Sequence, residues 1–191
     1  MQNHRVLLVL YAVFVNLLNE SNGVEEQAGC KDTSNLQVLG TCCNTPELEE
    51  LNEGEKAVET MCDKIVFGDY KITSSTTDEE RLELFECHAE CFFNGTRLLT
   101  TDMKLNETAL IAEYDASTGN FPHWKEPIAK AVESCLEKSV VSEVKPDAKC
   151  KSGSYQFSQC FGVKMYLYCP SENWKTGDEG CNKAREILMK C

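Results

Sequence analysis

The sequence predicts an all-α protein whose helices are joined by disulfides. Apolar residues recur at helical spacing in six segments, whereas no alternating strand pattern reaches a convincing length. The chain of 191 residues also carries 12 cysteines, an even number. In an oxidising compartment an even number implies full pairing, which here means six bridges.

The first two predicted helices span 47–67 and 78–93. In the first, Gly54 weakens the middle, and one face carries Leu51, Val58, Cys62 and Ile65. In the second, Thr77 and the acidic residues that follow it form an N-terminal cap signal. Its apolar face carries Leu82, Phe85, Ala89 and Phe92.

The remaining predicted helices span 105–114, 126–141, 154–169 and 177–191. The first and third of these are short candidates, and the other two have clear apolar faces: Ile128, Val132, Cys135 and Leu136, then Cys181, Ala184, Leu188 and Cys191. Glycine, serine and proline mark three loops between the helices: 68–77, 117–122 and 142–153.

Residues 1–23 have the layout of a secretory signal peptide. A short basic region precedes an apolar run at 6–18, and small and polar residues follow it. The run is too short to cross a hydrocarbon core of ~30 Å, so we expect cleavage after Gly23 rather than a membrane anchor. The mature chain, 24–191, is expected to form a single domain.

The formal net charge of −12 limits the classes of partner. Such an acidic chain is repelled by phosphate backbones and by anionic lipid surfaces. We therefore expect no nucleic acid as a partner. Since no second apolar run is long enough, we also expect no membrane insertion.

The stretch Cys87-His88-Ala89-Glu90-Cys91 could belong to a metal site, a catalytic site or a disulfide framework. On a helix the two cysteines share a face, and His88 is turned by about 100° away from Cys87. The other histidines, His4 and His123, stand alone, and no short-spaced ligand pair completes a zinc site. No nucleophile motif accompanies His88 either. We therefore expect no metal, no cofactor and no enzymatic activity, and we expect Cys87 and Cys91 to bond to different neighbours.

The cysteine spacing then becomes specific. A cysteine at 62, a pair at 87 and 91, one at 135 and a pair at 160 and 169 resemble the six-cysteine signature of insect odorant-binding proteins. The run "CFFNGTRLLTTDMKLNETALIAEY" resembles the segment after the third cysteine of that family. The additional Cys150 and Cys181, and "CPSENW" after Cys169, resemble the Plus-C branch.

The resemblance implies a bundle of about six to eight helices around an apolar cavity, with a core at 46–169, a C-terminal extension at 170–191 and an extra N-terminal segment. It also implies three bridges: Cys62–Cys91, Cys87–Cys160 and Cys135–Cys169. In an alternative assignment Cys150 is the fifth signature cysteine, which leaves Pro170 unexplained. Three further bridges would join Cys30, Cys42, Cys43, Cys150, Cys181 and Cys191, and we expect the first three of these to pair largely with the last three. Adjacent cysteines bridge badly, so Cys42 and Cys43 should have separate partners.

By resemblance, the function is to carry small hydrophobic odorants or pheromones, volatile or lipid-like, through extracellular sensillum lymph to olfactory receptors. A homodimer is a further expected assembly. The expected ligand contacts are Leu82, Phe85, Phe92, Leu110, Tyr114, Trp124, Phe161, Met165 and Tyr166, with Trp124 as a lid. For each residue the alternative is that it only fills the core.

Three further expectations concern the rest of the chain. Trp174 should pack the C-terminal extension, and a tail bonded at Cys191 could not swing freely to release ligand. Two sequons, at Asn94 and Asn106, are candidate glycosylation sites.

The competing functional class is a secreted, non-enzymatic interaction or scavenger protein that acts through its surface. A plant-type lipid-transfer fold would need a CxC motif after the Cys42-Cys43 pair, and none is present.

Overall fold

The computed structural model describes residues 39–45, 51–68, 70, 72–73, 75–117, 121–137 and 144–189. The expected signal peptide, Cys30 and Cys191 lie outside the described residues. Within the described part no helix is long and apolar enough to cross a membrane.

The described residues form helices joined by loops. The α-helices are α2 (Leu39–Cys42), α3 (Glu53–Val66), α4 (Asp78–Gly95), α5 (Glu107–Ser117), α6 (Lys125–Glu137), α7 (Ser154–Leu167) and α8 (Glu179–Leu188), and the 3-10 helix η2 is Pro122–Trp124. The extended pairings among these residues are two isolated bridges, Cys43 with Trp174 and Leu99 with Leu105. The prediction of an all-α fold is confirmed.

Capping side chains set where two helices begin. Asn52 precedes α3: its Oδ1 accepts a hydrogen bond from the Glu55 backbone N–H at 3.0 Å, and a Glu55 carboxylate oxygen accepts from the Asn52 N–H at 2.8 Å. Such a reciprocal capping box satisfies backbone donors that the first turn leaves open. The helix therefore begins at Glu53, several residues later than predicted. Thr77 and Glu80 form the same box before α4, where the predicted start is correct.

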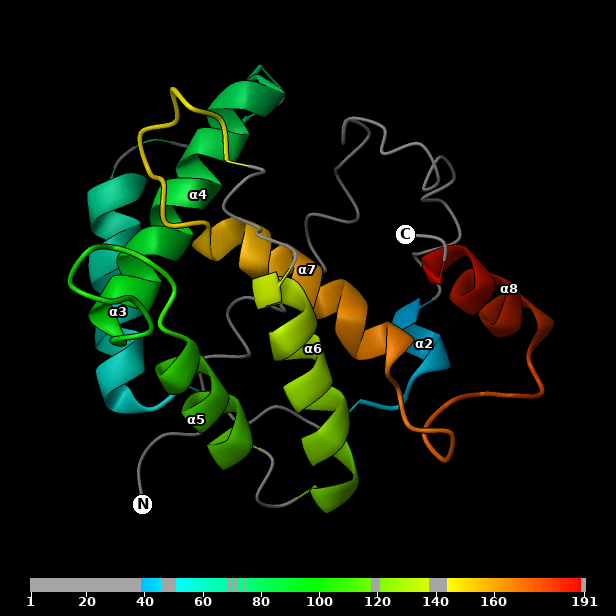
Figure 1. Ribbon diagram of the computed structural model, residues 1–191. Coiled ribbons are helices and arrows are strands. Elements are labelled where there is room, and N and C mark those ends of the chain that lie inside the picture. The colour runs from blue at the N-terminus through cyan, green and yellow to red at the C-terminus, as the bar shows by residue number, and fades with distance from the viewer. Residues whose placement is uncertain are drawn as a thin grey trace.

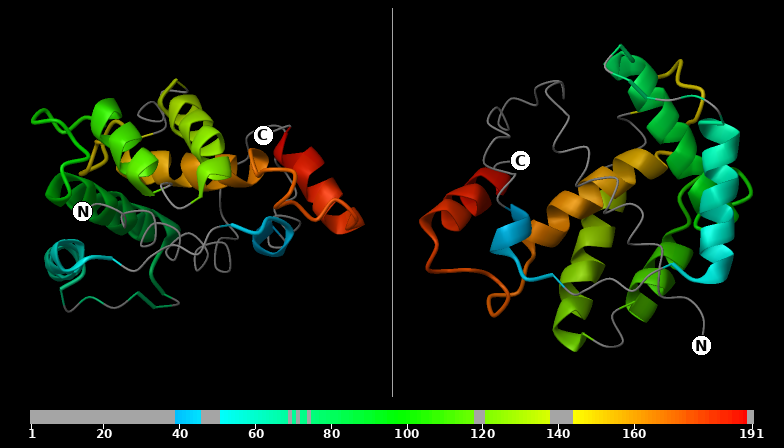
Figure 2. Two further views of the ribbon diagram at one scale, coloured as in Figure 1. Left: turned by 90° about the horizontal axis from the view of Figure 1, so that it is seen from below. Right: turned by 180° about the vertical axis from the view of Figure 1, so that it is seen from behind.

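Helix α7 lies at the centre of the molecule (Figure 1). It packs against α4, α6 and α8, while α3 packs on α4 and α5 packs on α6. The two views of Figure 2 show α2 and α8 together at one end of α7, away from α3. The buried apolar side chains of these helices form one cluster, which includes Phe92, Leu110, Val132 and Phe157.

Five disulfides cross-link the described residues: Cys42–Cys181, Cys43–Cys169, Cys62–Cys91, Cys87–Cys150 and Cys135–Cys160. Cys62–Cys91 joins α3 to α4, as expected. As the helix geometry indicated, Cys87 and Cys91 bond to different neighbours.

The expected pairings Cys87–Cys160 and Cys135–Cys169 are wrong. Cys160 lies on α7, the helix that packs most extensively on α6, and there it bonds to Cys135. The segment 144–153 runs beside α4 before α7 begins, so Cys150 is the cysteine within reach of Cys87. The signature is therefore completed by Cys150 and Cys160, the alternative assignment, and Cys169 belongs to the additional set.

The additional bridges join the beginning of the described chain to its end. Cys42 bonds to Cys181 of α8, as expected for pairing between the N-terminal and later cysteines. Its neighbour Cys43 bonds to Cys169, which is not one of the later cysteines expected for that pairing. The two adjacent cysteines thus have separate partners.

Trp174 packs the C-terminal segment, as expected. Its side chain is buried, its ring lies 4.7 Å from the guanidinium carbon of Arg185, and its Nε1–H donates to Asn182 Oδ1 at 3.4 Å. Arg185 also donates to the carbonyls of Leu167, the last residue of α7, and of Cys169, which follows shortly after it. These contacts hold α8 against α7 beside the two additional disulfides.

Candidate ligand-binding core

Four aromatic rings from three helices meet in the centre of the bundle. The rings of Tyr114 and Phe161 stack with their centroids 4.4 Å apart. Phe157 lies 6.1 Å from Phe161 and 6.3 Å from Tyr114, and Phe93 approaches Phe157 edge-on at 6.2 Å. We call Phe93, Tyr114, Phe157 and Phe161 the aromatic cluster. Offset and edge-on rings of this kind attract one another beyond the burial of their area.

Helical spacing positions the cluster. Phe157 and Phe161 are one turn apart on α7, so both point to the same side. Phe93 comes from the last part of α4 and Tyr114 from α5. Three helices thus place their rings at one buried site.

Burial also affects the acidity of the Tyr114 hydroxyl. The side chain is 1% exposed, and burial raises the pKa of its hydroxyl far above the ordinary value, with a smaller contribution from the neighbouring Glu113 carboxylate. A tyrosine hydroxyl is neutral at physiological pH in any case, and burial keeps the Tyr114 hydroxyl neutral in more alkaline solution as well.

Seven of the nine expected ligand contacts lie in the buried core: Phe92, Leu110, Tyr114, Trp124, Phe161, Met165 and Tyr166. Trp124, the last residue of η2, is 1% exposed, so its ring is part of the core and is not a lid on the surface. Phe161 and Met165, one turn apart on α7, keep 6% and 7% of their area exposed.

The two other expected contacts, Leu82 and Phe85, are half-buried near the start of α4 and are not among the residues of the core cluster. Phe85 stacks on Tyr155 with the ring centroids 6.1 Å apart. Residues near the two ends of α4 therefore lie in different environments, which helical periodicity alone does not reveal.

Sequence reasoning missed two members of the aromatic cluster, Phe93 and Phe157. The spacing of four residues between Phe157 and Phe161 was available as a signal, because it places both rings on one face. Phe93 follows Phe92 directly, and both are fully buried because α4 is covered on more than one side. A single apolar stripe does not identify the second side.

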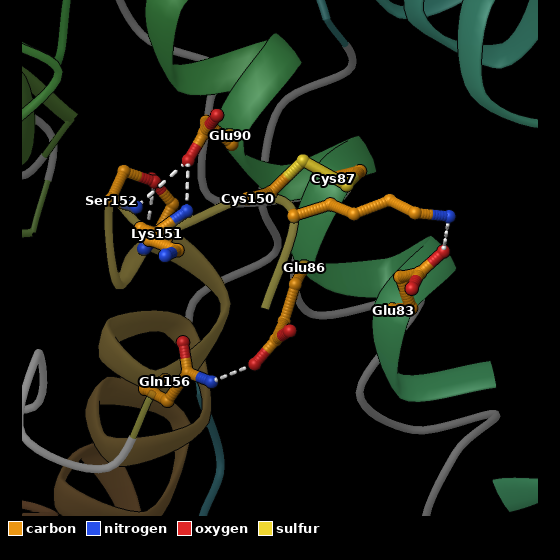
Figure 3. Close-up of a disulfide and its surroundings, with 10 residues drawn as sticks. Glu83, Glu86, Cys87, Glu90, Cys150, Lys151, Ser152 and Gln156 are labelled. Atoms are coloured by element: carbon orange, nitrogen blue, oxygen red, sulfur yellow. Dashed lines mark hydrogen bonds and ion pairs between the residues drawn. A yellow bond between two sulfur atoms is a disulfide. The ribbon is translucent and has the colours of Figure 1, made fainter. Parts of the chain in front are cut away.

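A second feature joins α4 to the segment before α7. Acidic side chains of α4 meet the basic segment 144–153, which we call the lysine segment (Figure 3). Glu79 pairs with Lys145 at 3.0 Å and Glu83 with Lys149 at 2.5 Å. One Glu90 carboxylate oxygen accepts from the backbone N–H groups of Lys151 and Ser152 at 2.7 and 2.8 Å.

Glu86 lies behind these contacts and is 6% exposed. Its Oε1 accepts a hydrogen bond from Gln156 Nε2 at 2.5 Å. Burial raises the pKa of the Glu86 carboxyl above its ordinary value, although the bond from Gln156 acts in the opposite direction. The carboxyl thus joins α4 to α7 at a cost in solvation when it is ionised.

His88 is more buried and better paired than the sequence suggested. It is 8% exposed, its Nε2 lies 2.9 Å from Asp63 Oδ1 of α3, and the Phe67 ring lies 5.2 Å away. Among the described residues no group of three or more histidine, cysteine or acidic side chains could hold a metal ion. The pair serves the packing of α3 on α4.

Helices cross-linked by Cys62–Cys91, Cys87–Cys150 and Cys135–Cys160 around an aromatic core define a class: small, disulfide-linked helical proteins. The model of the PBP/GOBP family matches residues 48–164, more than half of the chain. The chain belongs to this family, the pheromone/general odorant-binding proteins. No curated protein matches the chain.

Family membership supports a binding and carrier function for small odorant or pheromone molecules. The family is a binding family and not an enzymatic one. Together with the disulfides, it indicates an extracellular, secreted protein.

Proposed function

We propose that this protein is a secreted, non-enzymatic carrier that holds a small hydrophobic molecule against the aromatic cluster. The observation that supports this most strongly is the convergence of Phe93, Tyr114, Phe157 and Phe161 in a chain of the PBP/GOBP family. An apolar molecule that moves from water to such a site gains free energy in proportion to the area it buries.

The exposure of α7 supports a route of entry. Phe161 and Met165 keep a small exposed area on the same face of α7, whereas Tyr114 and Phe157 are closed off from solvent. A ligand therefore reaches the cluster past Phe161 and Met165. Ligand contacts extend from there to Phe92, Leu110, Trp124 and Tyr166.

The test is displacement of a fluorescent hydrophobic probe from the purified, fully oxidised chain by a panel of volatiles and fatty acids. We expect saturable binding at one site and competition by some of the panel at micromolar concentration. The informative variant is Phe161→Leu, which keeps an apolar side chain but removes one ring of the stack. Its matched control is Phe85→Leu, a ring on α4 outside the core cluster.

We expect Phe161→Leu to weaken competition by about two- to twelvefold, the range that corresponds to an aromatic contact of ~0.5–1.5 kcal/mol, and Phe85→Leu to leave it unchanged. Equal effects of the two variants would refute the placement of the ligand. Absence of saturable binding by a folded sample would refute the carrier function itself.

Three finer assignments extend this proposal. We place the chain in the Plus-C branch, which the additional bridges Cys42–Cys181 and Cys43–Cys169 support. We further propose transport through insect sensillum lymph to an olfactory receptor, with cleavage of 1–23 and a homodimer as the assembly.

Of the two sequons, Asn94 has an exposed side chain, while Asn106 Oδ1 accepts from the Ala109 N–H at 3.2 Å, so we expect a glycan at Asn94 first.

A further inference from the structure

A groove lies on the outside of the helices, separate from the aromatic cluster. It has a volume of about 430 Å³ and runs between the end of α3, the middle of α4, the loop 96–106 and the lysine segment. We call it the outer groove. Small-molecule pockets commonly enclose ~300–1,000 Å³, so the outer groove has room for a small ligand. None of the nine expected ligand contacts lines it.

The walls of the outer groove are apolar. Ile65 of α3, Leu84 of α4 and Met103 of the loop line it, and the Cys87–Cys150 disulfide lines it between α4 and the lysine segment. Ile65 is 66% exposed and Met103 is 36% exposed, and both line the same groove. Apolar groups left open to water in a concave site gain free energy when a hydrophobic molecule covers them.

Disulfides hold the shape of this groove. Cys87–Cys150 fixes the lysine segment to α4, and Cys62–Cys91 fixes α3 to α4 on the other side. The hydrogen bonds from Lys151 and Ser152 to Glu90 add a third attachment. A site held in this way is formed before a ligand arrives, which reduces the entropy lost on binding.

The rim of the groove selects for charge. Glu83, Cys87 and Glu90 are spaced i, i+4 and i+7 along α4, so they share one face of the helix. Figure 3 shows the two carboxylates on either side of the Cys87–Cys150 disulfide. Lys149, the cation among the lining residues, already pairs with Glu83 at 2.5 Å.

We propose that the outer groove binds an apolar molecule that carries a single ammonium group, with the hydrocarbon against Ile65, Leu84 and Met103 and the cation near Glu83 or Glu90. Two carboxylates against one lysine leave the rim negative, and the whole chain carries −12. A carboxylate ligand would have to take Lys149 from Glu83 and then lie beside two acidic groups, so it is disfavoured.

The experiment compares octylammonium, octanol and octanoate at pH 7, three probes with the same hydrocarbon and different head groups. Binding is followed by NMR of isotope-labelled isoleucine, leucine and methionine methyl groups in the oxidised chain. We expect octylammonium to shift Ile65, Leu84 and Met103 and to bind at least about tenfold more tightly there than octanoate. The preference over octanoate should shrink as salt screens the rim.

Glu83→Gln is the decisive variant, because it removes one rim carboxylate and frees Lys149. We expect it to weaken the binding of octylammonium by about three- to fivefold, which is within the range of an exposed ion pair. We expect it to strengthen the binding of octanoate. Glu79→Gln is the matched control: it breaks the similar surface pair with Lys145 on the same helix but does not line the groove. Met103→Glu should abolish groove binding of octanol, and Ile111→Glu, an equally exposed position on α5, should not.

Equal affinity of the three probes for the groove would overturn the proposal of an ammonium ligand. Octylammonium shifts confined to Leu110 and Met165, which belong to the core, would assign its binding to the carrier site and also overturn it. If octanol shifts the core methyl groups and no probe shifts the groove methyl groups, the groove proposal is overturned and the proposed carrier function stands. If the probes shift the groove methyl groups but not the core methyl groups, the carrier function is refuted and the groove proposal stands.

Discussion

At the scale of single residues, environment rather than residue type decides what each polar group does. Glu80 and Glu86 are both on α4, yet folding shifts their pKa values in opposite directions. Backbone and side-chain hydrogen bonds with Thr77 lower the pKa of Glu80, whereas burial raises the pKa of Glu86. The sequence identified the Thr77 cap because capping is local. It could not identify the burial of Glu86, which depends on a segment more than sixty residues away.

The cap gives the first prediction. Thr77→Ala removes the side-chain acceptor that satisfies the Glu80 N–H at 3.2 Å, so the first turn of α4 loses a hydrogen bond. We expect the free energy of unfolding to fall by about 1 kcal/mol, within the ~0.5–2 kcal/mol of such substitutions. Urea denaturation followed by circular dichroism measures it. Thr77→Ser, which keeps the hydroxyl, is the control and should stay close to the wild type.

Glu86 gives a prediction on pH. Its pKa in the folded state is raised, so the folded chain binds more protons than the unfolded chain just above the ordinary value of 4.5. The free energy of unfolding therefore falls as pH rises through that window, and the penalty persists at neutral pH. Glu86→Gln keeps an acceptor for Gln156 but does not titrate. We expect the free energy of unfolding of this variant to equal or exceed that of the wild type at pH 7. We also expect its free energy of unfolding to depend less steeply on pH between pH 4.5 and 7.

Urea denaturation at several pH values measures this slope, with Glu79→Gln as a control on an exposed carboxylate of the same helix. If the free energy of unfolding of Glu86→Gln has the same slope against pH as that of the wild type, burial of this carboxyl does not govern the pH dependence of stability.

At the scale of elements, the predicted helices are present, but the pairing between them had to come from the structure. Periodicity depends on neighbours three or four residues apart, so it identified the apolar faces of α6 and α8. In α3 and α4 it was only partly correct, because Ile65 is 66% exposed and Phe85 is not among the residues of the core cluster. The bridges Cys87–Cys150 and Cys135–Cys160 depend on how α7 enters between α4 and α6. Spacing fits two assignments of the fifth and sixth cysteines, and only the position of the lysine segment separates them.

The contact between α3 and α4 gives a third prediction. A Cβ atom added at Gly95 would lie 2.5 Å from Val58 Cγ1, too close for real atoms. Gly95→Ala must therefore displace the Val58 side chain or the helix that carries it, at a cost of ~1–3 kcal/mol in the free energy of unfolding. The double variant with Val58→Ala removes the clash, so we expect it to be more stable than the sum of the two single effects. A double-mutant cycle by urea denaturation measures this coupling, and strict additivity would contradict it.

At the scale of the whole molecule, the disulfides form two groups. Cys62–Cys91, Cys87–Cys150 and Cys135–Cys160 link neighbouring helices around the aromatic cluster, while the other two close the ends of the described chain upon each other. The family match at 48–164 covers the first group and not the second. The core that carries the proposed ligand site and the C-terminal segment are therefore held by different bonds.

This division gives a fourth prediction. Because Cys43–Cys169 stays closed, replacement of both Cys42 and Cys181 by serine opens only the short ring between these two bridges, and we expect a loss of ~2–4 kcal/mol in the free energy of unfolding. Trypsin should then cut faster near Lys183 and Arg185 of α8 than near Lys130 of α6. Probe binding at the aromatic cluster should persist in the variant, since none of its rings lies on α2 or α8. Loss of probe binding in a folded variant would mean that the terminal segments form part of the site.

The central claim is that a small hydrophobic molecule binds against the aromatic cluster. The most direct measurement is of nuclear Overhauser effects between the strongest unlabelled competitor of the probe panel and the isotope-labelled aromatic rings of the oxidised chain. We predict contacts from the ligand to the rings of Phe157, Phe161 and Tyr114, three members of the cluster. A bound ligand that contacts none of these rings would contradict the account.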